Sequence, residues 1–304
     1  MTGSLVGVVI VHFGKLEPTF GCLESVFEDE SEIDRRVVVV DNSGNFSLDD
    51  SPANLTILRR LDNPGFGAAA NAGLAEIDRD RACTCYLVLN NDAALQSGFL
   101  SAAAEALEVG VGAAGGPIRN AFDPSVLWYA GGGVNFLTGT VRQRRDEAVA
   151  ARRRDVGFLP ATAIAVFPEA WREVGGFDPR FFLYNEDVDL CLRFRRAGWR
   201  LRFEPRMTCG HFIGGATGSH EKSPLYLENL TRTRLLPFRF WPYRLYLAAL
   251  HTAYNALRIL GLGLQYGKRC GPYVTAVARG HAHALMTVNP VRKAQPAADE
   301  MTSE

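Results

Sequence analysis

The stretch "LVGVVIV" (residues 5–11) decides the class of fold. It is a nearly continuous run of branched apolar side chains, and "RVVVVDN" (residues 36–42) repeats the pattern. Runs without a polar face are typical of strands buried on both sides, as in a parallel sheet covered by helices. We expect a helix over residues 18–27 between these two strands, so the chain opens as strand, helix, strand.

The alternation of strands and helices continues through the first half of the chain. "LTILRR" (55–60) and "YLVLNND" (86–92) indicate two more strands, with helices over about 67–77 and 98–109. This order predicts an α/β doubly wound, mostly parallel sheet flanked by helices. Further on we expect antiparallel strands within 126–141, helices within 168–178 and from residue 186, and a strand at "RLRFEP" (200–205). From residue 225 the pattern is helical.

Composition and charge narrow the class of protein. The 304 residues are 47% hydrophobic and 22% charged, which is typical of a globular chain, and the zero net charge argues against nucleic acid as a partner. The six cysteines form no CxxC pair, so buried free thiols in a reducing compartment are expected. The first residues lack the basic region of a signal peptide, and no apolar run reaches the ~18 residues of a spanning helix. We therefore expect a cytoplasmic protein.

Charge is distributed unevenly along the chain. Residues 222–282 contain nine Lys or Arg and one acid, Glu228, so this segment carries +8 and the remainder −8. We expect a domain over 1–221, a basic helical region over 222–288 and a flexible tail over 289–304. Aromatic, leucine and arginine residues mix in the basic region, which predicts a helical surface that binds anionic membrane through Arg239, Arg244 and Arg258. Packing on the acidic remainder and a homodimer interface are open alternatives.

Polar residues follow the predicted strands. Asp41, Asn63 and Asp92 lie at or just after strand ends, where doubly wound sheets bind their ligands. In "NPGFGAAANAG" (63–73), Gly65 either makes the turn alone or lets it approach a nucleotide, to which Asn71 would then hydrogen-bond. Asp92 in "LVLNNDA" caps a helix or binds a diphosphate-bound divalent metal.

Two further segments carry residues of ambiguous role. His211 in "TCGHFIGG" is structural or a metal ligand. In "FFLYNEDVDLCLRFRRAGW" (181–199), the structural interpretation is that Asn185 caps a helix and that Asp189 pairs with Arg193 one turn on. The functional interpretation assigns chemistry to the Glu186–Asp187 pair.

Together and in this order, these segments resemble the family 2 glycosyltransferases with a GT-A fold. More narrowly, they are similar to the bacterial rhamnosyltransferase-like branch. The resemblance covers about residues 5–215. Residues 175–199 are its most specific part, because they combine "GGFD", an aromatic pair, "ED" and "AGW".

The resemblance implies a metal-dependent, inverting sugar transfer from a nucleoside diphosphate. Asp187 would be the general base, with Glu186 beside it, and Trp199 would serve packing. Asp92 and His211 would hold Mn2+ or Mg2+. The residues expected to line the nucleotide site, with Asp41 recognising the base, are Asp41, Asn63, Gly65, Asn71, Asn91 and Asp92. The chain departs from the family at Asn90, where the first acid of the metal motif is usual, and in "VHFG" (11–14) after the first strand.

We expect dTDP-rhamnose as the donor, with UDP-linked hexoses close behind. The acceptor would be a growing cell-surface glycan or its lipid-linked precursor, at the inner face of the plasma membrane. Two other functions stay open. A sugar-1-phosphate nucleotidyltransferase would need a Gly-rich basic loop after the first strand, where the sequence supplies only Lys15. A non-catalytic nucleotide-sugar or glycan-binding module is the second.

Overall fold

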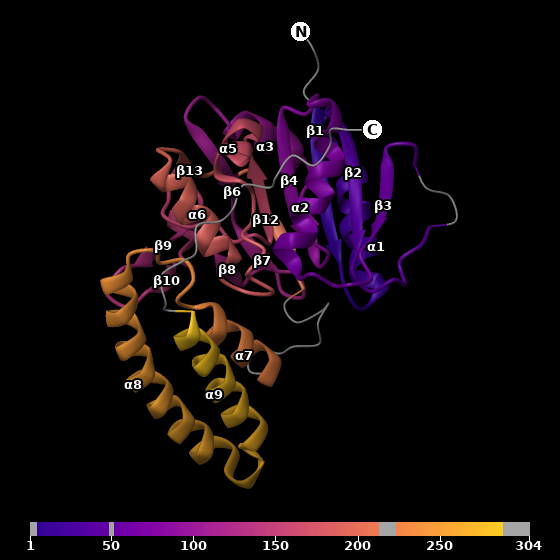
Figure 1. Ribbon diagram of the computed structural model, residues 1–304. Helices are drawn as coiled ribbons and strands as arrows, with labels where there is room; N and C mark the ends of the chain where they lie inside the picture. Colours follow the sequence, from indigo (N-terminus) through magenta and orange to yellow (C-terminus); the bar gives the residue numbers. More distant parts are fainter. Residues whose placement is uncertain (1–4, 49–51, 213–222, 288–304) are drawn as a thin grey trace, which may run out of the picture.

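The computed structural model describes residues 5–48, 52–212 and 223–287 (Figure 1). In these residues an eight-stranded sheet has the order β11-β13-β6-β12-β4-β1-β2-β3. Adjacent strands run parallel in the series β3-β2-β1-β4 and in the pair β6-β13. Strand β12 runs antiparallel to both of its neighbours, β4 and β6. The strands are β1 Leu5–His12, β2 Asp34–Asp41, β3 Leu55–Arg59, β4 Cys85–Asn90, β6 Val111–Gly115, β11 Arg154–Asp155, β12 Ala163–Val166 and β13 Arg200–Phe203.

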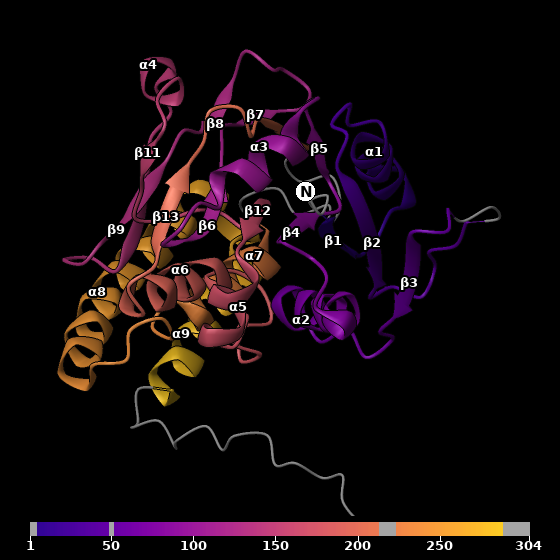
Figure 2. The same cartoon turned by 90° about the horizontal axis from the view of Figure 1, so that it is seen from above.

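Helices cover both faces of this sheet, which explains why its strands are apolar on both sides. Seen from above, α1 and α3 lie on one face and α2, α5 and α6 on the other (Figure 2). The helices are α1 Leu16–Phe27, α2 Phe66–Ile77, α3 Phe99–Ala106, α5 Pro168–Val174 and α6 Glu186–Arg196, with a short 3-10 turn at Asp78–Asp80. The α/β doubly wound class expected from the alternating pattern is confirmed.

A smaller sheet lies beside the main one. Its order is β5-β14-β7-β8, and a separate hairpin joins β9 to β10. The antiparallel strands expected within 126–141 are therefore present, divided between the small sheet and the hairpin. The bounds are β5 Ala93–Leu95, β7 Ile118–Asn120, β8 Leu127–Tyr129, β9 Gly132–Asn135, β10 Thr140–Gln143, the short helix α4 Glu147–Ala150 and β14 Cys209–His211.

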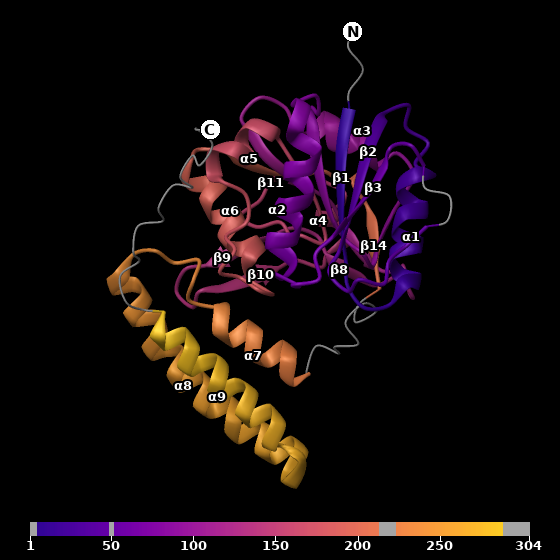
Figure 3. The ribbon, with the colours of Figure 1, turned by 45° about the vertical axis from the view of Figure 1, so that its right-hand side comes forward.

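Three helices follow and lie below the α/β unit (Figure 3). They are α7 Pro224–Thr233, α8 Trp241–Tyr266 and α9 Gly271–Met286, with a 3-10 turn at Gly267–Arg269 after α8. α9 packs closely on α7, because a Cβ atom at Gly280 would lie 2.4 Å from the Glu228 carbonyl oxygen. Among the described residues, no helix is long and apolar enough to cross a membrane.

The helical character expected after residue 225 is confirmed. The boundaries at 221 and 288 stay predictions, and the predicted tail over 289–304 lies outside the described residues.

Candidate active site

Asp92 and His211 meet across two paired strands. β4 ends at Asn90, and the chain turns through Asn91 and Asp92 into β5. β14 runs antiparallel to β5, with His211 opposite Ala93. This register places Oδ1 of Asp92 3.2 Å from Nε2 of His211. The fold therefore brings together the two side chains expected to hold a metal.

The pair fits two ligands of one divalent ion. Two ligand atoms about 2.1 Å from a metal and at right angles lie roughly 3 Å apart. Oδ1 of Asp92 and Nδ1 of His211 are buried, and neither has a hydrogen-bond partner among the described residues. The ring of Trp128 packs edge-on against the imidazole, with centroids 5.6 Å apart. Described residues supply no group of three or more His, Cys, Asp or Glu for a metal, so diphosphate oxygens would have to complete the coordination.

A buried chain of hydrogen bonds supports the turn that carries Asp92. The Asn91 amide donates to the Thr19 hydroxyl at 2.9 Å, and Thr19 lies 2.6 Å from Nδ1 of His12. Nε2 of His12 lies 2.9 Å from the side-chain oxygen of Asn45. An amide oxygen only accepts, so Nε2 carries the proton and Nδ1 accepts from Thr19. Asn91 thus has a positioning role here, and its contact with the nucleotide stays a prediction.

The Glu186–Asp187 pair begins α6, and Asp187 is half-buried. Glu186 is buried, and its Oε2 atom has no hydrogen-bond partner in the described part of the chain. The backbone N–H of Val188 donates to the Asp187 carboxylate at 2.8 Å. Burial raises the pKa of both carboxyls, and the adjacent Asp187 charge raises that of Glu186 further. A carboxylate with a raised pKa at a sheet edge suits proton transfer.

The Asp92–His211 pair and the Glu186–Asp187 pair occupy the same edge of the sheet. The Asn90 N–H donates to the Thr162 carbonyl at 3.0 Å, where β4 meets the start of β12. Leu159, three residues before Thr162, donates through its N–H to the sulfur of Cys191 in α6 at 3.3 Å. Asp92 follows Asn90 by two residues. The segment before β12 thus contacts both the end of β4, which leads to Asp92, and α6, which begins with Glu186 and Asp187.

Gly65 and Asn71 hold the segment that leads into the acid pair. The Asn71 amide nitrogen donates to the Phe177 carbonyl at 2.7 Å, and its oxygen accepts from the Phe177 N–H at 2.9 Å. Gly65 has a φ of 90°, and a Cβ there would lie 2.2 Å from the Phe182 carbonyl oxygen. The Phe66 N–H donates to that same carbonyl at 3.1 Å. These contacts give both residues a positioning role, and their contact with a nucleotide stays a prediction.

Asp41 and Asn63 occupy loops at this edge. Asp41, the last residue of β2, accepts three backbone N–H bonds of 2.8–3.0 Å from Ser43, Gly44 and Phe46. Its carboxylate therefore fixes the loop after β2. Asn63 has a φ of 39° and makes the turn before α2. Recognition of the base by Asp41, and nucleotide contact by Asn63, stay predictions.

Of the two contacts expected from a structural role of this segment, the Asp189–Arg193 pair is confirmed and the Asn185 cap is wrong. Asp189 pairs with Arg193 at 2.6 Å, as the spacing predicts. Asn185 precedes the helix, but its side chain does not cap it. The φ of Asn185 is 65°, and its amide donates to the Thr233 hydroxyl at 2.8 Å, so it joins the acid pair to α7. Trp199 packs on Phe167 and donates to Glu173 at 2.8 Å, in agreement with a packing role.

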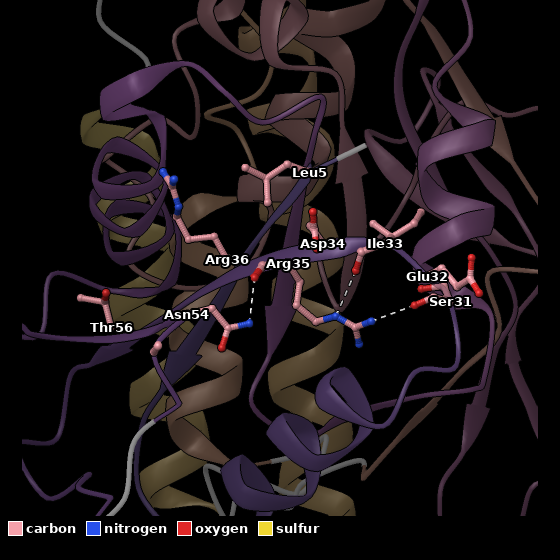
Figure 4. A pocket seen from close by; sticks show the side chains of 10 residues that line it. Leu5, Ser31, Glu32, Ile33, Asp34, Arg35, Arg36, Asn54 and Thr56 are labelled. Carbon is pink, nitrogen blue, oxygen red and sulfur yellow. Dashed lines mark hydrogen bonds between the residues drawn. The ribbon is translucent and has the colours of Figure 1, made fainter. Parts of the chain in front are cut away.

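A pocket at the opposite end of the sheet is structural. It lies where β1 and β2 begin and is lined by Arg35 and Asn54 among others (Figure 4). The Arg35 guanidinium donates to the backbone carbonyls of Val26, Asp29 and Ser31, and Asn54 donates to the Arg35 carbonyl. The guanidinium of Arg35 is therefore occupied by contacts that join loops. Doubly wound sheets bind ligands at the other end.

Comparison with known proteins agrees with this geometry. A profile of the family described as "Glycosyltransferase like family 2" matches residues 7–234. The chain belongs to this family. Two solved structures share its fold: GalNAc-T7 with UDP, GalNAc and Mn2+ (TM-score 0.55, 13% identity, 76% of this chain and 48% of that one), and the mannosyltransferase PcManGT from Pyrobaculum calidifontis with GDP-Man and Mn2+ (TM-score 0.51, 16% identity, 93% and 86%). The expected GT-A glycosyltransferase fold is confirmed.

Curated relatives match over shorter segments. The N-acetylglucosaminyl-diphospho-decaprenol L-rhamnosyltransferase of Mycobacterium tuberculosis is 38% identical over 81 residues, 27% of this chain and 26% of that protein. The pre-mycofactocin glycosyltransferase of the same organism is 30% identical over 195 residues, 58% of this chain and 37% of that protein. The chain thus spans about a quarter to a third of the length of these relatives. The first of these matches confirms the resemblance to rhamnosyltransferases over part of the chain.

Proposed function

We propose that this chain transfers a sugar from a nucleoside diphosphate to an acceptor hydroxyl, with inversion at the anomeric carbon. The observation that carries the proposal is the position of the Glu186–Asp187 pair at the same sheet edge as the Asp92–His211 pair. One edge then offers a proton acceptor and a place for a diphosphate. Inverting transfer is a single displacement and needs these two functions.

The described side chains divide the reaction between them. The acceptor oxygen bonds to the anomeric carbon as the bond from that carbon to the diphosphate oxygen breaks. Asp187, whose carboxylate accepts the Val188 N–H, takes the hydroxyl proton. Asp92 and His211 would hold Mn2+ or Mg2+, which when bound supplies positive charge to the departing diphosphate. The turn through Asn91 keeps Asp92 in place.

For the donor we propose dTDP-rhamnose, with UDP-linked hexoses as the second candidate. The names of two similar proteins, the decaprenol-linked rhamnosyltransferase and the rhamnosyltransferase WbbL of Escherichia coli (49% identical over 39 residues, 13% of this chain and 15% of that protein), support a rhamnosyl donor. The first name also supports an N-acetylglucosaminyl-diphospho-polyprenol acceptor. Such an acceptor would place the reaction at the cytoplasmic face of the plasma membrane.

A donor screen followed by a transfer assay tests the proposal. Thermal unfolding is recorded with dTDP-rhamnose, UDP-hexoses and GDP-mannose, each with Mn2+, Mg2+ or EDTA, because a ligand specific to the folded state raises the melting temperature. The stabilising donor is then incubated with an N-acetylglucosaminyl-diphospho-polyprenol. We expect a new glycoside whose anomeric configuration, read by NMR, is opposite to that of the donor. A product that retains the configuration would exclude the single displacement.

The same assay separates the two other functions. A non-catalytic module would be stabilised by the nucleotide sugar and form no glycoside. A sugar-1-phosphate nucleotidyltransferase would release pyrophosphate from a nucleoside triphosphate and a sugar phosphate. Membership of the glycosyltransferase family favours sugar transfer over both.

A further inference from the structure

Helix α8 exposes its apolar side. A surface helix usually buries its apolar stripe and turns charged residues to water. Here Leu257, Leu260 and Leu264 are 69%, 66% and 91% exposed, while Arg244 is only 3% exposed. The outward residues, called the α8 face below, are Leu245, Tyr246, Ala249, Leu250, Ala253, Tyr254, Leu257, Leu260 and Leu264.

Polar contacts on the inner side fix this orientation. The Arg244 guanidinium donates to the Thr287 carbonyl at the end of α9. His251 bonds through Nε2 to the Thr138 carbonyl at 2.8 Å, in the β9–β10 hairpin. Turning the α8 face inward would break these bonds and leave buried polar groups unpaired. The apolar surface is therefore a fixed feature of the fold.

The β9–β10 hairpin extends the apolar surface. At its tip Phe136 and Leu137 are 50% and 75% exposed. The Tyr243 hydroxyl donates to the Phe136 carbonyl, and the Tyr246 hydroxyl donates to the Leu137 carbonyl at 2.8 Å. Hairpin and helix thus form one continuous surface, larger than the single exposed apolar residues that are normal on soluble proteins.

Exposed cations border the α8 face at both ends. Arg239 precedes the helix, and Lys268 and Arg269 follow it. α8 and α9 contain no Asp or Glu. A second copy seated on this face would bring like charges together without an acid from either helix, whereas anionic lipid headgroups would match them. The charge pattern therefore favours lipid over a homodimer.

We propose that the α8 face lies on an anionic phospholipid surface, with its leucine and tyrosine side chains in the headgroup boundary and the helix parallel to the membrane. This modifies the expectation from the sequence, because the buried Arg244 cannot face the lipid. The inference rests on the proposed function in one respect: a face bound to lipid would bring the chain to a lipid-linked acceptor. α7, which packs with α9, receives the Asn185 hydrogen bond and so joins this region to the acid pair.

Vesicle co-sedimentation of the full chain tests the proposal. Vesicles of phosphatidylcholine alone are compared with vesicles that also contain phosphatidylglycerol. We expect binding to the anionic vesicles that weakens with salt. Replacing Leu257, Leu260 and Leu264 together by Gln should lower the partition coefficient about tenfold or more, because three apolar side chains no longer enter the lipid. Gln is nearly as good a helix former as Leu, so α8 should persist, as circular dichroism can verify.

Matched controls test whether the position of the replaced residues matters, by making the same kinds of substitution away from the α8 face. The double variant Leu61→Gln and Val109→Gln removes exposed apolar residues elsewhere and should bind like the wild type. Replacing Arg239, Lys268 and Arg269 by Gln should reduce binding to anionic vesicles, and the same change at Arg59, Arg81 and Arg152 should not. Because no donor is present, vesicle binding can succeed or fail independently of sugar transfer.

Three results would overturn the proposal. The wild type could stay in the supernatant with anionic vesicles at low salt. The triple leucine variant could bind as well as the wild type. Light scattering could show a dimer that the leucine variant converts to monomer, with no vesicle binding by either form, which would assign the α8 face to a second copy of the chain.

Discussion

Oδ1 of Asp92 lies 3.2 Å from Nε2 of His211, across the pairing of β5 with β14. The two residues come from distant parts of the sequence, and no local contact would place them together. Apart from this contact, Oδ1 of Asp92 and Nδ1 of His211 are buried and make no hydrogen bond within the described residues. The separation of these two atoms is compatible with the two-ligand divalent-metal site proposed above, whose remaining ligands would come from a diphosphate.

Asp92→Ala and His211→Ala should each weaken binding of a nucleoside diphosphate in the presence of Mn2+. Each change would remove one of the two proposed metal ligands, and we expect at least a tenfold higher Kd. Calorimetry with dTDP or UDP, with Mn2+ and then with EDTA, measures the effect. Asp62→Ala and His283→Ala, which remove the same residue types elsewhere, should leave Kd unchanged. Equal affinity of wild type and both variants, insensitive to EDTA, would leave Asp92 with a structural role alone.

Asn71→Asp should destabilise the fold by about 1–3 kcal/mol. The variant keeps an acceptor for the Phe177 N–H, but it loses the donor to the Phe177 carbonyl and places a charged oxygen beside it. Urea unfolding of variant and wild type measures the difference. Unchanged stability together with weaker donor binding would instead support the direct nucleotide contact expected from the sequence.

Glu186→Gln should stabilise the protein at alkaline pH. Because the folded-state pKa of Glu186 is raised above its unfolded value, its favourable contribution is complete below the ordinary carboxyl pKa and is lost as pH rises through the raised pKa. The neutral amide avoids this loss. Thermal unfolding should show a small difference near about pH 5 and an advantage of roughly 1 kcal/mol or more near about pH 9. An advantage that shrinks as pH rises would contradict the pKa direction.

The sequence predicted the sheet well, because β1, β2 and β4 are long apolar runs whose burial on both faces leaves a clear pattern. It did not predict β6, β11 or β12, and β12 is the antiparallel strand between β4 and β6. Its apolar run, "AIAVF" (163–167), is short, and such runs do not distinguish strand from helix. The flanking prolines at 160 and 168 were the available signal.

The candidate site was predictable in its residue types but less so in their partners. Asp92 lies beside His211, and Glu186 and Asp187 begin α6, whereas the roles that the resemblance implies for these four residues stay predictions. Asn71 and Asp41 bond to the backbone of loops that only the folded chain brings near. His12 and Thr19 were not anticipated, because a lone buried histidine in a strand gives no sequence signal of its hydrogen-bond partners.

The rate of sugar transfer by Asp187→Asn, measured beside its donor affinity, tests the central claim most directly. We predict that the variant folds and binds nucleoside diphosphate with wild-type affinity but transfers sugar at least about 100-fold more slowly, because the amide cannot take the acceptor proton. Glu186→Gln, measured in parallel, should retain more activity than Asp187→Asn. Near wild-type transfer by Asp187→Asn, with transfer abolished in Glu186→Gln, would contradict the assignment of Asp187 as the general base.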